Sequence, residues 1–279
     1  MRKSDGLNPG DPDLGLSSPL SVAIDTRDRD TVQMVRRAVD SRSVLLAYQP
    51  VMQARAPDKP AFYEGFIRVL DQTGRIIPAG DFIDVVEAQE LGRKLDTWAL
   101  RLGIDALERV PALRLAINMS ARSIGYPDWI RTLRGALKRS PTLGERLILE
   151  ITERTAIVMP ELVQVFMAEM QREGVSFALD DFGAGYTAFK YLKEFYFDII
   201  KIDGEFIRNI TTSPDNQVIA QAMISLGQHF DMLVVAEHVE TAQDAEFLIA
   251  AGADLLQGYC FGAPTVRPWW AEKDAQRLA

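Results

Sequence analysis

The chain has 279 residues, 39 acidic and 31 basic side chains, a formal net charge of −8, two histidines and one cysteine. One cysteine excludes a disulfide framework, and so few Cys and His residues exclude an ordinary structural zinc site. The acidic balance argues against long nucleic acid as a partner, because phosphate backbones are bound by basic surfaces.

The sequence indicates where the protein resides and how it is divided. No apolar run approaches the ~20 residues of a membrane helix, so we expect no membrane segment in this chain. The N-terminus lacks an apolar signal region and the single Cys260 suits a reducing compartment, which together predict a cytoplasmic protein. We expect a flexible leader over residues 1–28, one folded domain over 29–268 and a C-terminal tail over 269–279.

The first predicted element is a short helix over residues 29–41, and strand and helix patterns follow it. Short β-branched runs predict eight strands, at residues 44–51, 62–70, 113–120, 146–152, 175–181, 198–203, 232–237 and 254–259. Amphipathic stretches predict helices at residues 81–91, 95–107, 126–138, 160–173, 214–229 and 241–251. This order favours an α/β (β/α)8 barrel of the TIM type, with a doubly wound open sheet as the alternative.

Polar side chains occupy strand ends whose surroundings should be buried on both faces. They are Gln49, Glu64, Asn118, Glu150, Asp180, Asp181, Lys201, Asp203, Glu237 and Gln257. Barrel enzymes build their active sites at the C-terminal rim of the strands, so we expect these residues to converge on one mouth. Clustered carboxylates need neutralisation, and oxygen ligands favour Mg²⁺, Mn²⁺ or Ca²⁺ over zinc or copper. Paired divalent cations are a recurring device for phosphodiester hydrolysis.

Eight short motifs follow one another in order between Tyr48 and Pro264. They read YQPV, EGFIR, INMSAR, LEITE, DDFGAGY, IIKIDGEFI, VVAEHVE and LQGYCFGAP. Together they closely resemble the EAL-domain family, the bacterial cyclic di-GMP phosphodiesterases. The resemblance implies an EAL-type barrel whose first strand runs antiparallel to the rest. It also implies hydrolysis of cyclic di-GMP to linear pGpG by two-metal activation of water.

The resemblance gives a role to each position that matches a family motif. The implied metal ligands are Glu64, Asn118, Glu150, Asp180 and Asp181, of which Asp180 bridges two ions. The implied catalytic residues are Lys201, Glu237 and Asp203. Lys201 would orient the attacking water, and Glu237 would act as a base or as a further ligand. The implied cofactor is a pair of Mg²⁺ or Mn²⁺ ions, with Ca²⁺ inhibitory.

Other matching positions point to substrate and partner contacts. The implied substrate-side residues are Gln49, Arg68 and Gln257, among which Arg68 offers a bidentate fork to a phosphate. Glu153, Phe182 and Gly183 match a loop, reaching to Thr187, that couples the site to a dimer interface. We therefore expect a homodimer formed through helices beside this loop, with cyclic di-GMP as the small-molecule partner.

Several positions depart from the family pattern. The signature reads Glu64-Gly65-Phe66 in place of Glu-Ala-Leu, so the acid is kept while its neighbours change. Ala184, Ala188 and His238 replace residues that the family usually keeps as Thr, Ser and Gly. These changes support an alternative in which the domain is a catalytically weak or inactive receptor for cyclic di-GMP, or a protein-interaction module. A glycerophosphodiesterase barrel is disfavoured, because such sites commonly use histidines.

Overall fold

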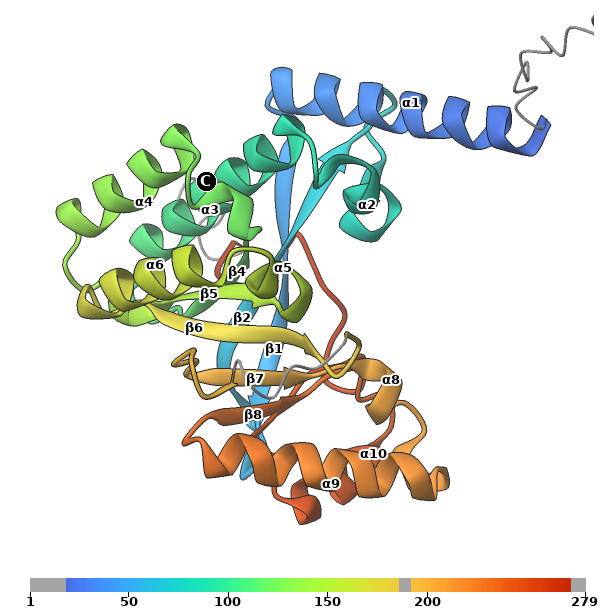
Figure 1. Cartoon of the computed structure of the whole chain (residues 1–279), viewed down its shortest axis with the longest axis vertical. Coiled ribbons are helices and arrows are strands. Elements are labelled where there is room, and N and C mark those ends of the chain that lie inside the picture. The colour runs from blue at the N-terminus through green and yellow to red at the C-terminus, as the bar shows by residue number, and fades with distance from the viewer. Residues whose placement is uncertain (1–18, 186–191, 272–279) are drawn as a thin grey trace, which may run out of the picture.

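The structure, a computed structural model, describes residues 19–185 and 192–271 (Figure 1). Its strands are β1 (Val44–Gln53), β2 (Ala56–Leu70), β3 (Ile76–Pro78), β4 (Leu115–Asn118), β5 (Leu147–Thr152), β6 (Ser176–Phe182), β7 (Ile199–Ile202), β8 (Leu233–Ala236) and β9 (Leu255–Leu256). Its α-helices are α1 (Pro19–Asp40), α2 (Ile83–Val86), α3 (Glu90–Arg109), α4 (Pro127–Arg139), α5 (Glu153–Val158), α6 (Pro160–Arg172), α8 (Gly204–Ile207), α9 (Pro214–His229) and α10 (Ala242–Ala251).

Eight strands close into a barrel in the order β1–β9–β8–β7–β6–β5–β4–β2, and β2 pairs with β1 to complete the ring. Strand β1 is antiparallel to both of its neighbours, whereas the other ring strands run parallel to one another. Strand β3 lies outside the ring and pairs with β2. This topology confirms the predicted TIM-type barrel with one reversed strand, and the closed ring excludes the doubly wound alternative.

The helices differ from the predicted ones near the N-terminus. Helix α1 begins at Pro19, so the predicted boundary at residue 28 falls inside a helix; residues 1–18 lie outside the described part of the chain. A short α2 and one long α3 replace the two helices predicted for residues 81–107. A Cβ atom at Gly92 would lie 2.7 Å from the carbonyl oxygen of Glu87, so glycine lets α3 start against the end of α2. Within the described residues, none of the helices has the length and apolar character of a membrane span.

The barrel interior begins with a layer of apolar side chains, one from each ring strand, which we call the floor layer. It consists of Val51, Phe62, Ala116, Ile148, Ala178, Ile199, Val235 and Leu255. Alternate residues of a strand point to the same face, so the residue two positions from each floor residue also points into the barrel. The main hydrophobic cluster lies between the strands and the surrounding helices, and a third cluster joins α1, α2 and the start of α3 to β1, β2 and β3.

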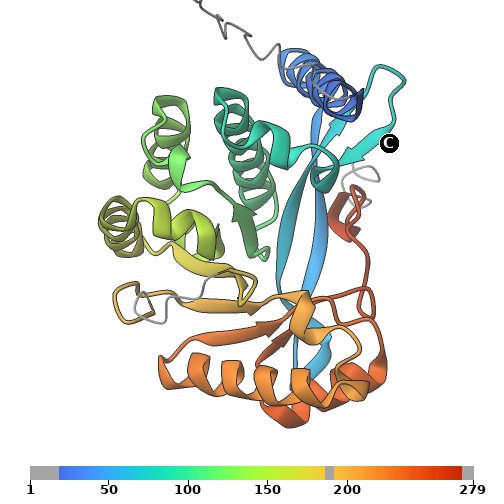
Figure 2. The same cartoon turned by 45° about the vertical axis from the view of Figure 1, so that its right-hand side comes forward.

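A C-terminal segment covers part of the outer face of β1 and β2, which are joined by a hairpin and not by a helix. Figure 2 shows this red segment running alongside the two blue strands. Thr265 bridges to Tyr48 of β1, and the ring of Trp270 meets Tyr48 and Tyr63 edge-on at centroid distances of 5.1 and 4.9 Å. Trp270 is buried and Trp269 is half-exposed, so the first residues of the predicted tail pack on the barrel; residues 272–279 lie outside the description.

We predict that Trp270→Ala lowers the free energy of unfolding by about 3–5 kcal/mol, because it removes a buried indole and uncovers the strand faces. Trp269→Ala is the matched control. It removes a half-exposed ring and a 3.2 Å hydrogen bond to the Tyr63 hydroxyl, which contributes about 1 kcal/mol. Urea denaturation of both variants measures the difference, and equal losses would show that Trp270 does not have this covering role.

Candidate active site and metal centre

One inward residue from each ring strand, or from the position directly after it, forms a polar layer above the floor layer, and we call it the polar ring. Its members are Gln49, Glu64, Asn118, Glu150, Asp180, Lys201, Glu237 and Gln257. On the parallel strands each lies two residues after its floor residue, whereas on the reversed β1 Gln49 lies two residues before Val51. Apart from the partly exposed Asn118, all of them are buried. The structure therefore brings together eight residues that the sequence places far apart.

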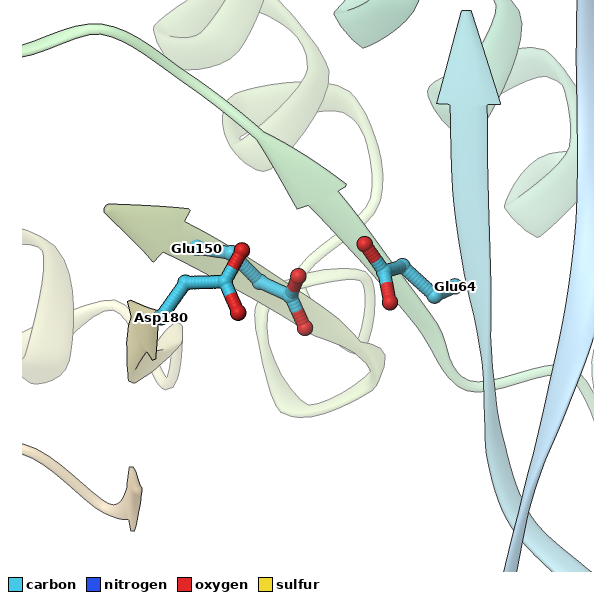
Figure 3. A group of neighbouring side chains, drawn as sticks. All are labelled: Glu64, Glu150 and Asp180. Carbon is cyan, nitrogen blue, oxygen red and sulfur yellow. The ribbon is translucent and has the colours of Figure 1, made fainter. Parts of the chain in front are cut away.

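Lys201 is the centre of the polar ring. Its ammonium nitrogen lies 3.0 Å from carboxylate oxygens of Glu64, Glu150 and Asp180. It also lies 2.9 Å from Glu237. One buried positive charge thus faces four carboxylates, and three of them, from β2, β5 and β6, lie close together in Figure 3.

Amide side chains complete the network around Glu64. Asn118 donates a 2.7 Å hydrogen bond to Oε1 of Glu64, and Gln257 donates a 2.7 Å hydrogen bond to Oε2. Gln257 also donates to Oε1 of Gln49, whose own amide nitrogen donates to the carbonyl of Gly262. Of the predicted substrate-side residues, Gln257 therefore holds the signature glutamate directly, and Gln49 holds Gln257.

The adjacent aspartates reach the site through an irregularity in β6. The pairing of β6 with β7 shifts register between Leu179 and Phe182, and Asp181 adopts a left-handed conformation with φ of 56°. Such a bulge lets consecutive side chains lie on the same side of a strand, and aspartate tolerates this backbone better than most residues. Asp181 consequently lies in a group with Asp180 and Glu237, while Asp180 also belongs to a group with Glu64 and Glu150.

The residues fit a pair of divalent cations. In each of the two groups the ligand oxygens lie within 4.8 Å of one another, and Asp180 is common to both. The donors are oxygens only, which suits hard cations. Oε1 of Glu150 is buried without a hydrogen-bond partner among the described residues, although burying an unpaired carboxylate oxygen is costly. A bound cation would provide the missing partner.

Titration of the polar ring follows from burial and from this excess of negative charge. Burial favours the neutral form of Glu64, but Lys201 and the hydrogen bond from Gln257 outweigh it and lower its pKa. For Glu150, burial and the charge of Glu64 raise the pKa well above its ordinary value. Burial raises the pKa of Glu237 to about 8 against the opposing effect of Lys201. Burial and the neighbouring Asp180 raise the pKa of Asp181 to about 6.

Two other predicted site residues, Asp203 and Arg68, and the substituted His238 lie outside the polar ring. Asp203 caps α8 by accepting a 2.7 Å hydrogen bond from the amide of Glu205. Arg68 lies on β2 beyond Glu64, with its guanidinium carbon 5.6 Å from the ring centre of Phe66. His238 has a left-handed φ of 53°, and a Cβ atom at Gly204 would lie 2.5 Å from its ring, so His238 packs against α8.

The predicted loop is described only in its first part. Glu153 begins α5 and is buried, and one of its carboxylate oxygens accepts a hydrogen bond of 3.4 Å from the amide of Gly183. Phe182 is buried at the end of β6, and Gly183 has a φ of 102° that favours glycine. The last residue of the predicted loop, Thr187, and the substituted Ala188 lie outside the described residues.

Asp96 is a residue with a site-related role that was not predicted from the sequence. From α3 it accepts hydrogen bonds from the amide of Ser120, at 2.9 Å, and from the hydroxyl of Ser123, at 2.6 Å. Burial raises its pKa to about 6 despite these bonds. Asp96 thereby anchors the turn that follows Asn118. An acid on the apolar face of a predicted helix, next to Leu95 and Ala99, was the available signal.

Comparison with known proteins was consistent with the family that the motifs indicate. The EAL domain family model matches residues 32–264. The cyclic di-GMP phosphodiesterase NbdA of Pseudomonas aeruginosa is 31% identical over 244 residues, which cover 86% of this chain and 31% of that protein. The cyclic di-GMP phosphodiesterase PdeF of Escherichia coli is 30% identical over 243 residues, covering 85% of this chain and 32% of that protein. The chain thus spans about a third of the length of these relatives.

Solved structures of similar fold include complexes with a cyclic dinucleotide. The PaMucR phosphodiesterase in complex with c-di-GMP superposes with a TM-score of 0.74 at 29% identity, covering 90% of this chain and 100% of that one. The FimX EAL domain from Pseudomonas aeruginosa bound to c-di-GMP gives a TM-score of 0.77 at 26% identity, covering 85% and 97% of the two chains.

We predict that the metal-free protein loses stability as the pH rises from about 4.5 to 8. The pKa of Glu237 is raised to about 8 from an ordinary 4.5, so the folded state holds a proton that the unfolded state releases. The protonated Glu237 contributes its full stabilisation below the unfolded-state pKa of 4.5. This contribution is lost as the pH rises through the folded-state pKa of about 8. Asp181, with a pKa raised to about 6, acts in the same direction at lower pH.

Urea denaturation in EDTA at several pH values measures this dependence. Glu237→Gln should flatten it, and Glu246→Gln, an exposed change on α10, should leave it as it is in the wild type. Stability that rises with pH over this range would contradict the assigned proton.

Proposed function

The chain belongs to the EAL-domain family, and we propose that it is a metal-dependent phosphodiesterase that hydrolyses cyclic di-GMP to linear pGpG. Membership confirms the family predicted from the motifs. The observation that carries the proposal is the polar ring, in which two groups of carboxylates share Asp180 beside a buried lysine. The activity of the similar phosphodiesterases supports it, since the matched residues include the whole ring.

We assign one cation to Glu64, Asn118, Glu150 and Asp180, and the second to Asp180 and Asp181. Mg²⁺ or Mn²⁺ is the proposed native ion, and Ca²⁺ the proposed inhibitor. Bound divalent cations supply Lewis acidity that activates water and offsets the charge of the phosphate.

The remaining roles belong to side chains of the polar ring and its rim. Lys201 holds the carboxylates in position and has an ammonium group that can orient water toward the phosphate. Glu237 suits a general base, because its pKa of about 8 lies near neutrality, and it also lies in a ligand group. Gln49, Gln257 and Arg68 are the proposed substrate contacts, with Asp203 near the second ion.

We predict that the wild-type protein forms pGpG from cyclic di-GMP with Mg²⁺ or Mn²⁺, and that Ca²⁺ suppresses this turnover. Glu64→Ala should lower kcat/KM by at least about 10²- to 10³-fold, because losing a cation removes several kcal/mol of transition-state stabilisation. Glu246→Gln, on the exposed face of α10, is the control and should keep wild-type activity. Chromatography of the nucleotide products measures the outcome.

Two results would contradict this function in different ways. Normal turnover by Glu64→Ala would overturn the metal assignment. Tight binding of cyclic di-GMP in calorimetry, with the ligand recovered intact in the presence of either metal, would identify the receptor alternative that the substitutions at Gly65 and Phe66 raised.

We also propose that the chain forms a homodimer through the end of α5 and the outer face of α6. Val158, Leu162 and Val165 are 59, 42 and 69% exposed there, which places three apolar side chains on one surface. Helix α5 begins with Glu153, which contacts the loop after β6, so the surface adjoins the site.

We predict that Val165→Glu converts the dimer to a monomer, because it would place a charge in an apolar interface. Light scattering at increasing protein concentration measures the change. Val218→Glu, at a position that is 67% exposed on α9, is the matched control and should remain dimeric. A strict monomer for the wild type at high concentration would refute the proposed dimer.

A further inference from the structure

Arg68 is a second basic residue of the site, and unlike Lys201 it is not surrounded by carboxylates of the described residues. It lies on the same face of β2 as Glu64 and Phe66, above the polar ring, and it is half-buried. Its Nη1 donates a 3.0 Å hydrogen bond to the carbonyl of Ile67, and within the described residues the guanidinium has no ion-pair partner. Most of its donor groups therefore remain available to a ligand.

The ring of Phe66 is the close neighbour of this guanidinium. The centroid lies 5.6 Å from the guanidinium carbon, within the range in which an aromatic face attracts a cation. Burial lowers the pKa of Arg68, while nearby Tyr259, Asp81 and Glu64 favour its charged form. Beyond the one hydrogen bond to Ile67, the other N–H groups of the guanidinium remain available, and such N–H groups form the fork that recognises phosphate.

We propose that Phe66 is a positioning residue: its ring holds the Arg68 guanidinium at the mouth so that the fork meets a phosphate of the dinucleotide. The identity of that ligand rests on the proposed function, whereas the contact between the two side chains does not. Phe66 thereby acts on ligand binding through Arg68, and the reacting atoms are left to the polar ring.

Steady-state kinetics separate this role from a catalytic one. Phe66→Leu keeps an apolar side chain but removes the aromatic face, so KM should rise about two- to five-fold while kcat stays at the wild-type value. Phe66→Trp, which offers a stronger face, should keep the wild-type KM. Thermal unfolding of each variant verifies that it is folded. If Phe66→Leu instead lowers kcat by two- to five-fold, the proposal is overturned.

A double-mutant cycle tests whether the effect passes through Arg68. Calorimetry with cyclic di-GMP in EDTA gives the Kd of the wild type, Phe66→Leu, Arg68→Ala and the double variant. Arg68→Ala should raise Kd on the order of ten- to a hundred-fold, and Phe66→Leu should add nothing in that background. Additive effects would mean that Phe66 contacts the ligand by itself, and they overturn the proposal.

The same measurements distinguish this inference from the proposed activity. A wild type that binds cyclic di-GMP without cleaving it removes the phosphodiesterase function, yet the cycle still decides the role of Phe66. A ligand-independent readout is the NMR signal of the Arg68 side chain. Ring-current shifts should be present in the wild type and Phe66→Trp and lost in Phe66→Leu, and their absence from the wild type overturns the contact.

Discussion

A single buried ammonium group surrounded by four carboxylates is the interaction on which the barrel interior depends. Lys201 reaches side chains from four other strands, so its position requires each of them to present the correct face. A slip of one residue in any of these strands would turn its carboxylate away from the ammonium. Removing partners from a buried charge costs several kcal/mol, so these ion pairs disfavour alternative registers.

Reversal of the first strand leaves this arrangement intact, because alternation has the same period in both chain directions. Gln49 precedes its floor residue and Glu64 follows its own, yet the two are paired across β1 and β2. The reversal does change how the outside of the barrel is covered. A hairpin provides no crossover helix, so Trp270 from the C-terminal segment packs on that part of the strands. Closure of the site and packing of the tail are thus linked through β1 and β2.

Much of the fold could be predicted because strand periodicity and buried polar residues are local signals. The eight ring strands and the polar residues at their ends were visible in this way, and the reversed strand came from family resemblance. The three-residue β3 and the start of α1 could not be predicted from the sequence, because tertiary contacts determine both. Nothing local shows that Asp181 has a left-handed backbone, or that Asp96 bonds to a turn 24 residues away. Such features depend on partners from distant parts of the chain.

The effect of the acidic side chains on anion binding depends on where they lie in the structure. A net charge of −8 spread over the surface would repel any phosphate, yet several of these acids lie together in the polar ring and beside it. With one ammonium among them, the metal-free ring reduces its charge by holding protons, as the raised pKa values of Glu150 and Glu237 indicate. Two divalent cations would displace those protons and add positive charge where a phosphate would arrive. The acidic surface therefore disfavours a long polyanion, whereas the proposed cations would make this one mouth suitable for a small anionic dinucleotide.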